Sequence, residues 1–274
     1  MGNKILVSVF DSERTAFEGL AAIKDLHRDG DITVYASTVI AKDPSGTVSV
    51  RQSADNGPLG TLVGIVTGGF VGLLAGPAGV AVGAYIGGFG GLMHDLFKAG
   101  VSMDFVDEVS ASLIPGKSAV IADIDEMCVT PIDTRIGALG GTTFRRFPGE
   151  VIDAELVRET DAARMELDQL QAELRESSAE AKANLEKSID AQRTKLHAMV
   201  DRVEKTLAQE KSEFEARLAT LREQQGKARE GKRERIDTRI DELKVSHEAR
   251  KAKLEEARHL AKASLEATRE ALVP

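Results

Sequence analysis

Residues 56–94 separate two parts of the chain that differ from them in composition. Their sequence is NGPLGTLVGIVTGGFVGLLAGPAGVAVGAYIGGFGGLMH, and it contains no Asp, Glu, Lys or Arg. A four-residue step returns to nearly the same face of a helix, and glycine costs about 1 kcal/mol relative to alanine in a helix interior. A row of glycines at this step is typical of apolar helices whose backbones pack closely. We therefore predict a glycine-zipper helical hairpin over residues 56–99, turning near Pro77. Its packing residues fall in two series of that spacing: Gly60, Gly64, Gly68, Gly72, Gly76, and then Gly79, Gly83, Gly87, Gly91.

The length of this hairpin leaves two environments open. Each arm has about 16 residues, or about 24 Å of helix, against a hydrocarbon core of roughly 30 Å. One interpretation is a tight or re-entrant hairpin in a membrane with both ends on one side. The other is a hairpin buried inside a protein assembly, with or without lipid. Because soluble monomers rarely expose large apolar patches, both interpretations predict a homo-oligomer.

The flanking residues 1–55 and 100–149 predict one α+β domain into which the hairpin is inserted. Their apolar runs, turn signals and a Ser12 helix cap indicate strands and helices in the order of a split βαβ, or ferredoxin-like, unit. The expected strands are residues 5–10, 32–41, 47–53, 118–124 and 142–147, and the expected helices are residues 13–30, 103–113 and 131–139.

Residues 150–274 predict a long coiled-coil helix with an eleven-residue repeat. A hendecad corresponds to about 3.67 residues per turn and favours a nearly straight helix packing. The repeat slips over residues 224–235, QQGKAREGKRER, which predict either a bend or the turn of an antiparallel hairpin. The expected core residues are Leu174, Leu185, Leu196, Val203, Leu207, Phe214, Leu218, Leu243, Leu254 and Leu265.

Such repeats also occur in helices that lie on lipid surfaces, which usually carry large apolar anchors and an excess of Lys and Arg. Here the tail holds 25 basic and 28 acidic residues, and Phe214 is its one aromatic residue. Helix–helix packing is therefore the favoured interpretation. The tail is expected to join neighbouring subunits through a coiled coil or to bind a protein partner.

Composition argues against several classes of function. The chain has 36 Lys and Arg against 44 Asp and Glu, and both halves are acidic, so no nucleic acid partner is expected. One cysteine, Cys128, cannot form an internal disulfide framework. Residues 1–10 run directly into Asp11 as a strand would, so no signal peptide is expected.

The remaining chemical signals are weak. Gly116, Lys117 and Ser118 resemble the end of a phosphate-binding loop, but Ala111 stands where its first glycine belongs. Asp123, Asp125 and Glu126 form a small acidic cluster at the end of an expected strand and are interpreted as a solvated loop, with weak cation binding as a minor alternative. The five histidines lack metal-ligand spacing. We expect no catalytic residues, metal or cofactor.

Several stretches together resemble a bacterial family of unknown function, domain of unknown function 1269. They are DLHRDGDI at residues 25–32, KDPSGTV at 42–48, the glycine block, and DFVDEVSASLIPGKSAVI at 104–121. The resemblance spans residues 4–147, and the long coiled-coil tail departs from the usual short members. It implies a glycine-zipper membrane protein without assigned activity.

The leading hypothesis is thus a non-enzymatic, self-assembling scaffold on the cytoplasmic side of the inner membrane, in contact with lipid. An alternative is a soluble cytoplasmic cage, tube or filament whose hairpins form an apolar, lipid-holding interior. A second alternative is a ligand-sensing module, since small domains of this topology bind metabolites between subunits.

Overall fold

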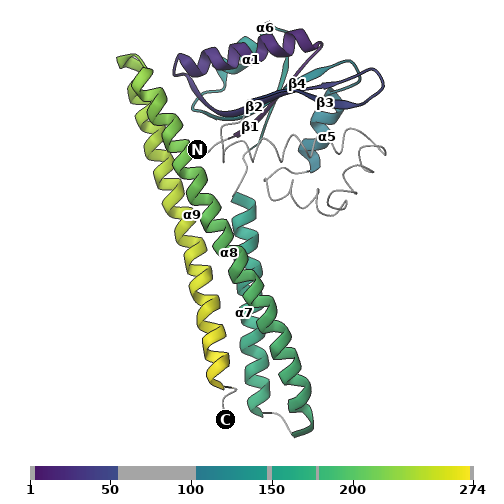
Figure 1. Ribbon diagram of the computed structural model, residues 1–274, viewed down its shortest axis with the longest axis vertical. Helices are drawn as coiled ribbons and strands as arrows, with labels where there is room; N and C mark the ends of the chain where they lie inside the picture. The colour runs from purple at the N-terminus through teal and green to yellow at the C-terminus, as the bar shows by residue number, and fades with distance from the viewer. Residues whose placement is uncertain (1–3, 55–102, 147–149, 177–178, 272–274) are drawn as a thin grey trace. The chain divides into compact units, whose positions relative to one another are not determined.

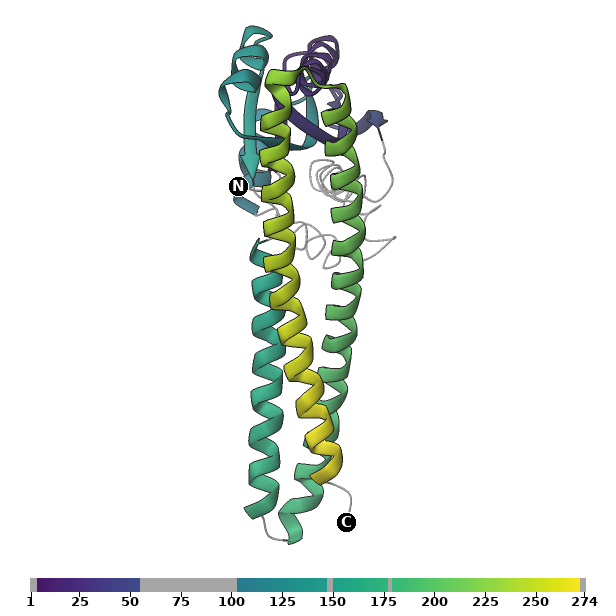
Figure 2. The same cartoon turned by 90° about the vertical axis from the view of Figure 1, so that its left-hand side faces the viewer.

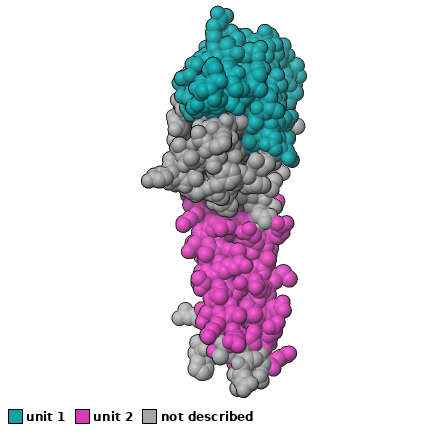
Figure 3. Space-filling view, turned by 90° about the vertical axis from the view of Figure 1, so that its right-hand side faces the viewer, with its two compact units in different colours: residues 1–152, 213–244 teal, residues 153–212, 245–274 magenta. Residues whose placement is uncertain are grey.

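The computed structural model describes residues 4–54, 103–146, 150–176 and 179–271, which form five strands and six helices. The chain divides into two compact units (Figure 3). Unit 1 comprises Met1–Ile152 and Glu213–Lys244, and unit 2 comprises Asp153–Ser212 and Val245–Pro274. The glycine series of residues 56–99 lies outside the described residues.

Unit 1 is built on one antiparallel sheet with the order β3-β2-β4-β1-β5 (Figure 1). Both β1 and β2 run antiparallel to β4, so they are parallel to each other and flank it. The strands are continuous apolar runs where both faces are covered, as β1 and β4 are. Their bounds are β1 Lys4–Phe10, β2 Ile32–Lys42, β3 Val48–Ala54, β4 Ser118–Glu126 and β5 Thr142–Arg146.

Helices α1 (Glu13–Arg28) and α6 (Thr130–Ala138) cover one face of this sheet, as Figure 1 shows. Ser12 caps α1, because its side chain accepts the Thr15 backbone N–H while the Thr15 hydroxyl accepts the Ser12 N–H. The apolar stripe of α1 packs on alternate residues of the strands. The described elements of this unit thus begin and end within about two residues of their predicted bounds.

Helix α5 (Met103–Ser112) covers the opposite face. Phe105, Val106 and Val109 pack there against the residues of β1 and β4 that alternate with those under α1. One sheet therefore carries two separate apolar cores. The end of this second face, beyond Ile121, continues with Asp123 and Asp125, which the register places on the same side as Ile121.

The described residues of the tail form three helices, and of the two predicted alternatives at residues 224–235 the structure has the turn. They are α7 (Glu150–Glu176), α8 (Ala179–Lys227) and α9 (Glu230–Ala271). Helix α8 ends inside the predicted 224–235 segment, where Ala228 is the one apolar residue and cannot continue a buried stripe. Figure 2 shows α8 and α9 side by side and joined at this end, so the segment forms a turn between antiparallel helices.

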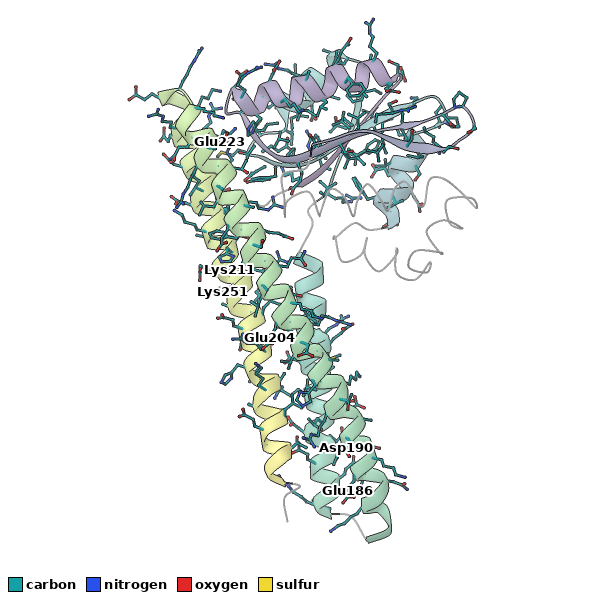
Figure 4. The ribbon with its side chains drawn as sticks, viewed as in Figure 1. Glu186, Asp190, Glu204, Lys211, Glu223 and Lys251 are labelled. Atoms are coloured by element: carbon teal, nitrogen blue, oxygen red, sulfur yellow. The ribbon has the colours of Figure 1, made fainter. Side chains whose placement is uncertain are left out.

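Unit 2 is a three-helix bundle of α7 with parts of α8 and α9. Glu204 of α8, labelled in Figure 4, accepts a hydrogen bond from Lys262 Nζ of α9 at 2.6 Å. Arg202 Nη1 lies 3.2 Å from Glu159 Oε2 of α7. The apolar rows meet in the centre, where Leu167, Ile189, Leu196, Val200, Ala261 and Leu265 pack together.

The predicted tail core residues differ in burial. Four of them are buried: Leu196, Val203, Leu254 and Leu265. The other six are half-buried: Leu174, Leu185, Leu207, Phe214, Leu218 and Leu243. The buried rows of unit 2 pack among helices of the same chain.

Gly19 of α1 gives a direct test of packing on the first face. A Cβ there would lie 2.2 Å from Cζ of the buried Phe10 ring. We expect Gly19→Ala to lower the stability by about 1–3 kcal/mol, as overpacking does. The midpoint of urea unfolding of the full chain measures this loss.

Gly137 of α6 supplies the matched control, because nothing lies within 4 Å of its added Cβ. Gly137→Ala is expected to be neutral or to stabilise by up to about 1 kcal/mol through helix propensity. Equal destabilisation by the two alanines would contradict the packing role given to Gly19.

Candidate functional site: a buried charge cluster under a helical tip

The most unusual chemistry in unit 1 lies where the residues Glu213–Lys244, here called the helical tip, pack on the sheet. The tip joins the end of α8 to the beginning of α9. Tyr35 of β2 forms an apolar contact set with Leu221, Ala228, Ile236 and Ile240 of the tip. The pairing of β2 with β4 shifts between Val34 and Ala36, so Tyr35 is an extra residue on its strand. Such a bulge re-aims a side chain.

An ion pair between Arg217 and Asp123 lies at the centre of this contact. Arg217 Nη2 is 2.6 Å from Asp123 Oδ2, and Nη1 is 3.3 Å from Oδ1, so the pair is bidentate. The two side chains are 8% and 0% exposed. The guanidinium also lies 4.5 Å from the centre of the Tyr35 ring. Burial acts to lower the pKa of Arg217, but the charge and hydrogen bond of Asp123 raise it above its ordinary value.

Gln224 of the tip satisfies three polar groups at the junction of α1 and β2. Its Nε2 donates to the carbonyl oxygens of His27 and Ile32, both at 2.6 Å. Its Oε1 accepts from Thr33 Oγ1 at 2.7 Å. A side-chain amide thus replaces water at backbone groups that the tip buries.

Arg239 and Asp125 are less well satisfied. Arg239 is 1% exposed, and its Nη2 donates to the Gly30 carbonyl at 2.8 Å, but its Nε and Nη1 are buried without a hydrogen-bond partner among the described residues. Burial raises the pKa of Asp125 to about 6, although Arg239 opposes this shift. Burial likewise lowers the pKa of Arg239, against the opposing effect of Asp125. The low dielectric of the site therefore disfavours both charges.

Charged residues at the rim complete the contact. Arg235 Nη1 lies 3.3 Å from Asp31 Oδ1, and Lys232 also pairs with Asp31. Gly30 has a φ of +78°, and a Cβ built on it would lie 3.2 Å from the Lys232 Cβ. Glycine is thus needed twice at this position, for its backbone conformation and for the close approach of the tip.

A second buried charge network lies on the α1 side of the sheet. The side chain of Glu126 is 0% exposed and lies 3.3 Å from Lys4 Nζ and 2.6 Å from Arg145 Nε. Arg145 Nη2 also contacts Asp133 at 2.6 Å. The prediction that Asp123, Asp125 and Glu126 form a solvated loop is therefore wrong, because β4 extends through Glu126 and all three carboxylates are buried.

Other parts of the described chain offer less chemistry. Cys128 is exposed, and its Sγ lies 3.4 Å from Thr130 Oγ1. Among the described residues, no group of three or more His, Cys, Asp or Glu is placed to hold a metal. A hollow of about 480 Å³ lies between α1 and α6, and its lining combines apolar residues with charged and polar ones: Ala21, Ala22, Ala138, Leu139, Glu18, Asp25, Thr134 and Arg135.

The sequence contained one signal for the buried charges. Asp123 and Asp125 continue the two-residue alternation of an apolar strand, which is typical of one sheet face. Their cationic partners had no such signal, since Arg217 lies 94 residues from Asp123. The tail pattern indicated which helical residues are apolar, and it did not indicate that the helical tip packs on the sheet.

These features define an α+β protein with a helical tail. Residues 61–169 match the model of a family described as Protein of unknown function (DUF1269). The match begins in the glycine series and ends in α7, and it confirms the resemblance predicted from the sequence. No curated protein and no solved structure gives a significant match. Among the described helices, none is long and apolar enough to cross a membrane.

The Arg217–Asp123 pair predicts a strong effect of breaking one partner. Arg217→Met leaves the Asp123 carboxylate buried without this cation, and we expect a loss of about 3–5 kcal/mol. The double variant Arg217→Met with Asp123→Asn removes both charges and is expected to recover most of that loss. Urea unfolding of the full chain measures both. A single variant as stable as the unsubstituted protein would contradict the role given to this pair.

Asp125 predicts a pH-dependent difference in stability. Its pKa of about 6, above the ordinary 3.8, means that the folded state binds this proton more tightly than the unfolded state. The ionised carboxylate therefore destabilises the fold above pH 6, and the penalty disappears as the pH falls towards 4. Asp125→Asn is expected to stabilise the protein by about 1–3 kcal/mol at pH 7–8 and to have little effect near pH 4.

His27 makes the comparison with the variant necessary. Burial and Arg239 lower the pKa of His27, so its neutral form in the fold costs stability as the pH falls. The effect of His27 on stability opposes that of Asp125 over part of the same pH range. The contribution of His27 cancels when the unfolding free energy of the unsubstituted protein is subtracted from that of the Asp125→Asn variant at each pH. A difference that does not depend on pH would contradict the prediction.

Proposed function

We propose that this protein is a non-enzymatic, self-assembling scaffold that associates with a membrane through residues 56–99. The observation that carries the proposal is a charge-free stretch with two series of glycines at four-residue spacing, five in the first and four in the second. The family match begins inside that series, at residue 61. Close packing between glycine faces is a means of association that does not depend on the exclusion of water, so it works in lipid.

The sheet unit supports the idea that this segment is an insertion. Strand β3 ends at Ala54 and α5 begins at Met103, and both belong to unit 1. Residues 55–102 therefore connect two elements of the same unit. The strand order β2-β4-β1-β5, with β1 and β2 parallel on either side of β4, supports a ferredoxin-like domain with β3 added at one edge.

The structure of the tail supports a narrower role for it than joining neighbouring subunits in a coiled coil. The buried leucines of unit 2 pack against helices of the same chain. We therefore assign self-assembly to residues 56–99 and propose the exposed faces of the tail for binding a protein partner. The buried carboxylates Asp123 and Glu126 pair with Arg and Lys of the same unit, which favours a structural role over catalysis.

Substitution within the glycine series tests this proposal. Gly68→Leu with Gly83→Leu places a large side chain on each predicted packing face. We expect the mass of the assembly in mild detergent, measured by light scattering, to fall to that of smaller species. Gly69→Leu with Gly88→Leu makes the same chemical change outside the two rows and is expected to leave the mass largely unchanged. Equal masses for the two double variants would contradict the glycine-packing role.

A further inference from the structure

The helical tip is attached to the sheet in a way that differs from the rest of unit 1. Helices α1 and α6 pack on the sheet through a large apolar core, whereas the apolar part of the tip contact is Tyr35 with a few aliphatic residues. The remainder of that contact consists of ion pairs and hydrogen bonds from Arg217, Gln224 and Arg239. Buried ion pairs recover little free energy beyond their own desolvation.

Part of this polar contact reduces the stability of the attachment between the tip and the sheet. Arg239 retains two buried N–H groups without a partner among the described residues, next to a carboxylate that burial also disfavours. A buried network with unsatisfied members is less stable than an apolar contact of the same size. The Arg239–Asp125 side of the contact therefore weakens the attachment that Arg217 and Asp123 provide.

The tip contributes to neither of the apolar cores that hold the sheet together. Residues 228–229, in the middle of the tip, are the break between α8 and α9, and a Cβ added at Gly226 or Gly231 would meet nothing within 4 Å. Separation of the tip thus leaves both sheet cores intact, which is the condition for a local opening below the global unfolding free energy.

We propose that the helical tip is a reversible latch, whose opening uncovers Thr33, Tyr35, Asp123 and Asp125 while the sheet remains folded. The occupant of this sheet surface is the chain's own segment Glu213–Lys244. When open, the surface presents two carboxylates and an aromatic ring, a combination suited to a guanidinium group. This inference does not depend on the proposed membrane role.

Thiol labelling of a residue under the tip tests the latch in the full-length chain. Thr33→Cys, with Cys128→Ser to remove the native thiol, introduces a reporter thiol that detects opening of the tip. Ser8→Cys in the same background introduces a control thiol, because Ser8 is equally buried at 0% exposed but lies on the α1 side of the sheet. Both substitutions remove one side-chain hydrogen bond. We expect the reporter thiol to be labelled at least about tenfold faster than the control thiol, as for a local opening.

Two further substitutions separate the latch from global unfolding. Gly19→Ala, which crowds the core under α1, is expected to speed the labelling of the control thiol and to leave that of the reporter thiol unchanged. Arg239→Met with Asp125→Asn removes the poorly satisfied charges and is expected to slow the labelling of the reporter thiol about tenfold. Nitration of Tyr35, located by peptide mass spectrometry, is expected to be slowed by this double substitution by about the same factor as the labelling of the reporter thiol.

Three results would overturn the latch. The first is equal labelling of the reporter and control thiols, and the second is equal acceleration of both by Gly19→Ala, since either means that the tip separates only when the sheet unfolds. The third is faster labelling of the reporter thiol in the Arg239→Met, Asp125→Asn variant, which means that those charges hold the tip in place.

Discussion

The buried ion pair between Asp123 and Arg217 constrains how the helical tip packs on the sheet of unit 1. It joins the end of a central strand to a helix 94 residues further along the chain, and both side chains are nearly inaccessible to water. A buried carboxylate without its cation is strongly destabilising. When the helical tip covers this end of the second face, Arg217 must accompany it, and Tyr35, Gln224 and Arg239 contribute the other contacts between the tip and the sheet.

The parts of the fold that depend on near neighbours could be predicted from the sequence. Ser12 and Thr15 form a capping box within four residues, and Pro44 and Gly46 mark the turn between β2 and β3. The apolar run along residues 118–124 placed a buried strand there. In each case the deciding interaction lies within about one helical turn or one strand, where residue preferences and periodicity have their full effect.

The candidate site could not be predicted because its partners are distant in sequence. Asp123 and Asp125 have the appearance of loop residues until Arg217 and Arg239 are placed beside them. An eleven-residue pattern shows which side of a helix is apolar, and it does not show which element covers that side. For the same reason the sequence allowed either a bend or a turn at residues 224–235, and the contact of Leu221 with Ile236 accompanies the turn.

Two kinds of association thus organise the protein. Within the chain the helical tip packs on the sheet, and in the proposed assembly the glycine faces of neighbouring chains pack on each other. The central claim is that residues 56–99 place the scaffold in lipid. Ultracentrifugation of a gently broken cell lysate, with and without mild detergent, tests it most directly. We expect the protein to sediment with membranes and detergent alone to release it. A very large particle that stays in solution without detergent would contradict this claim and favour an assembly whose apolar segments are enclosed by protein.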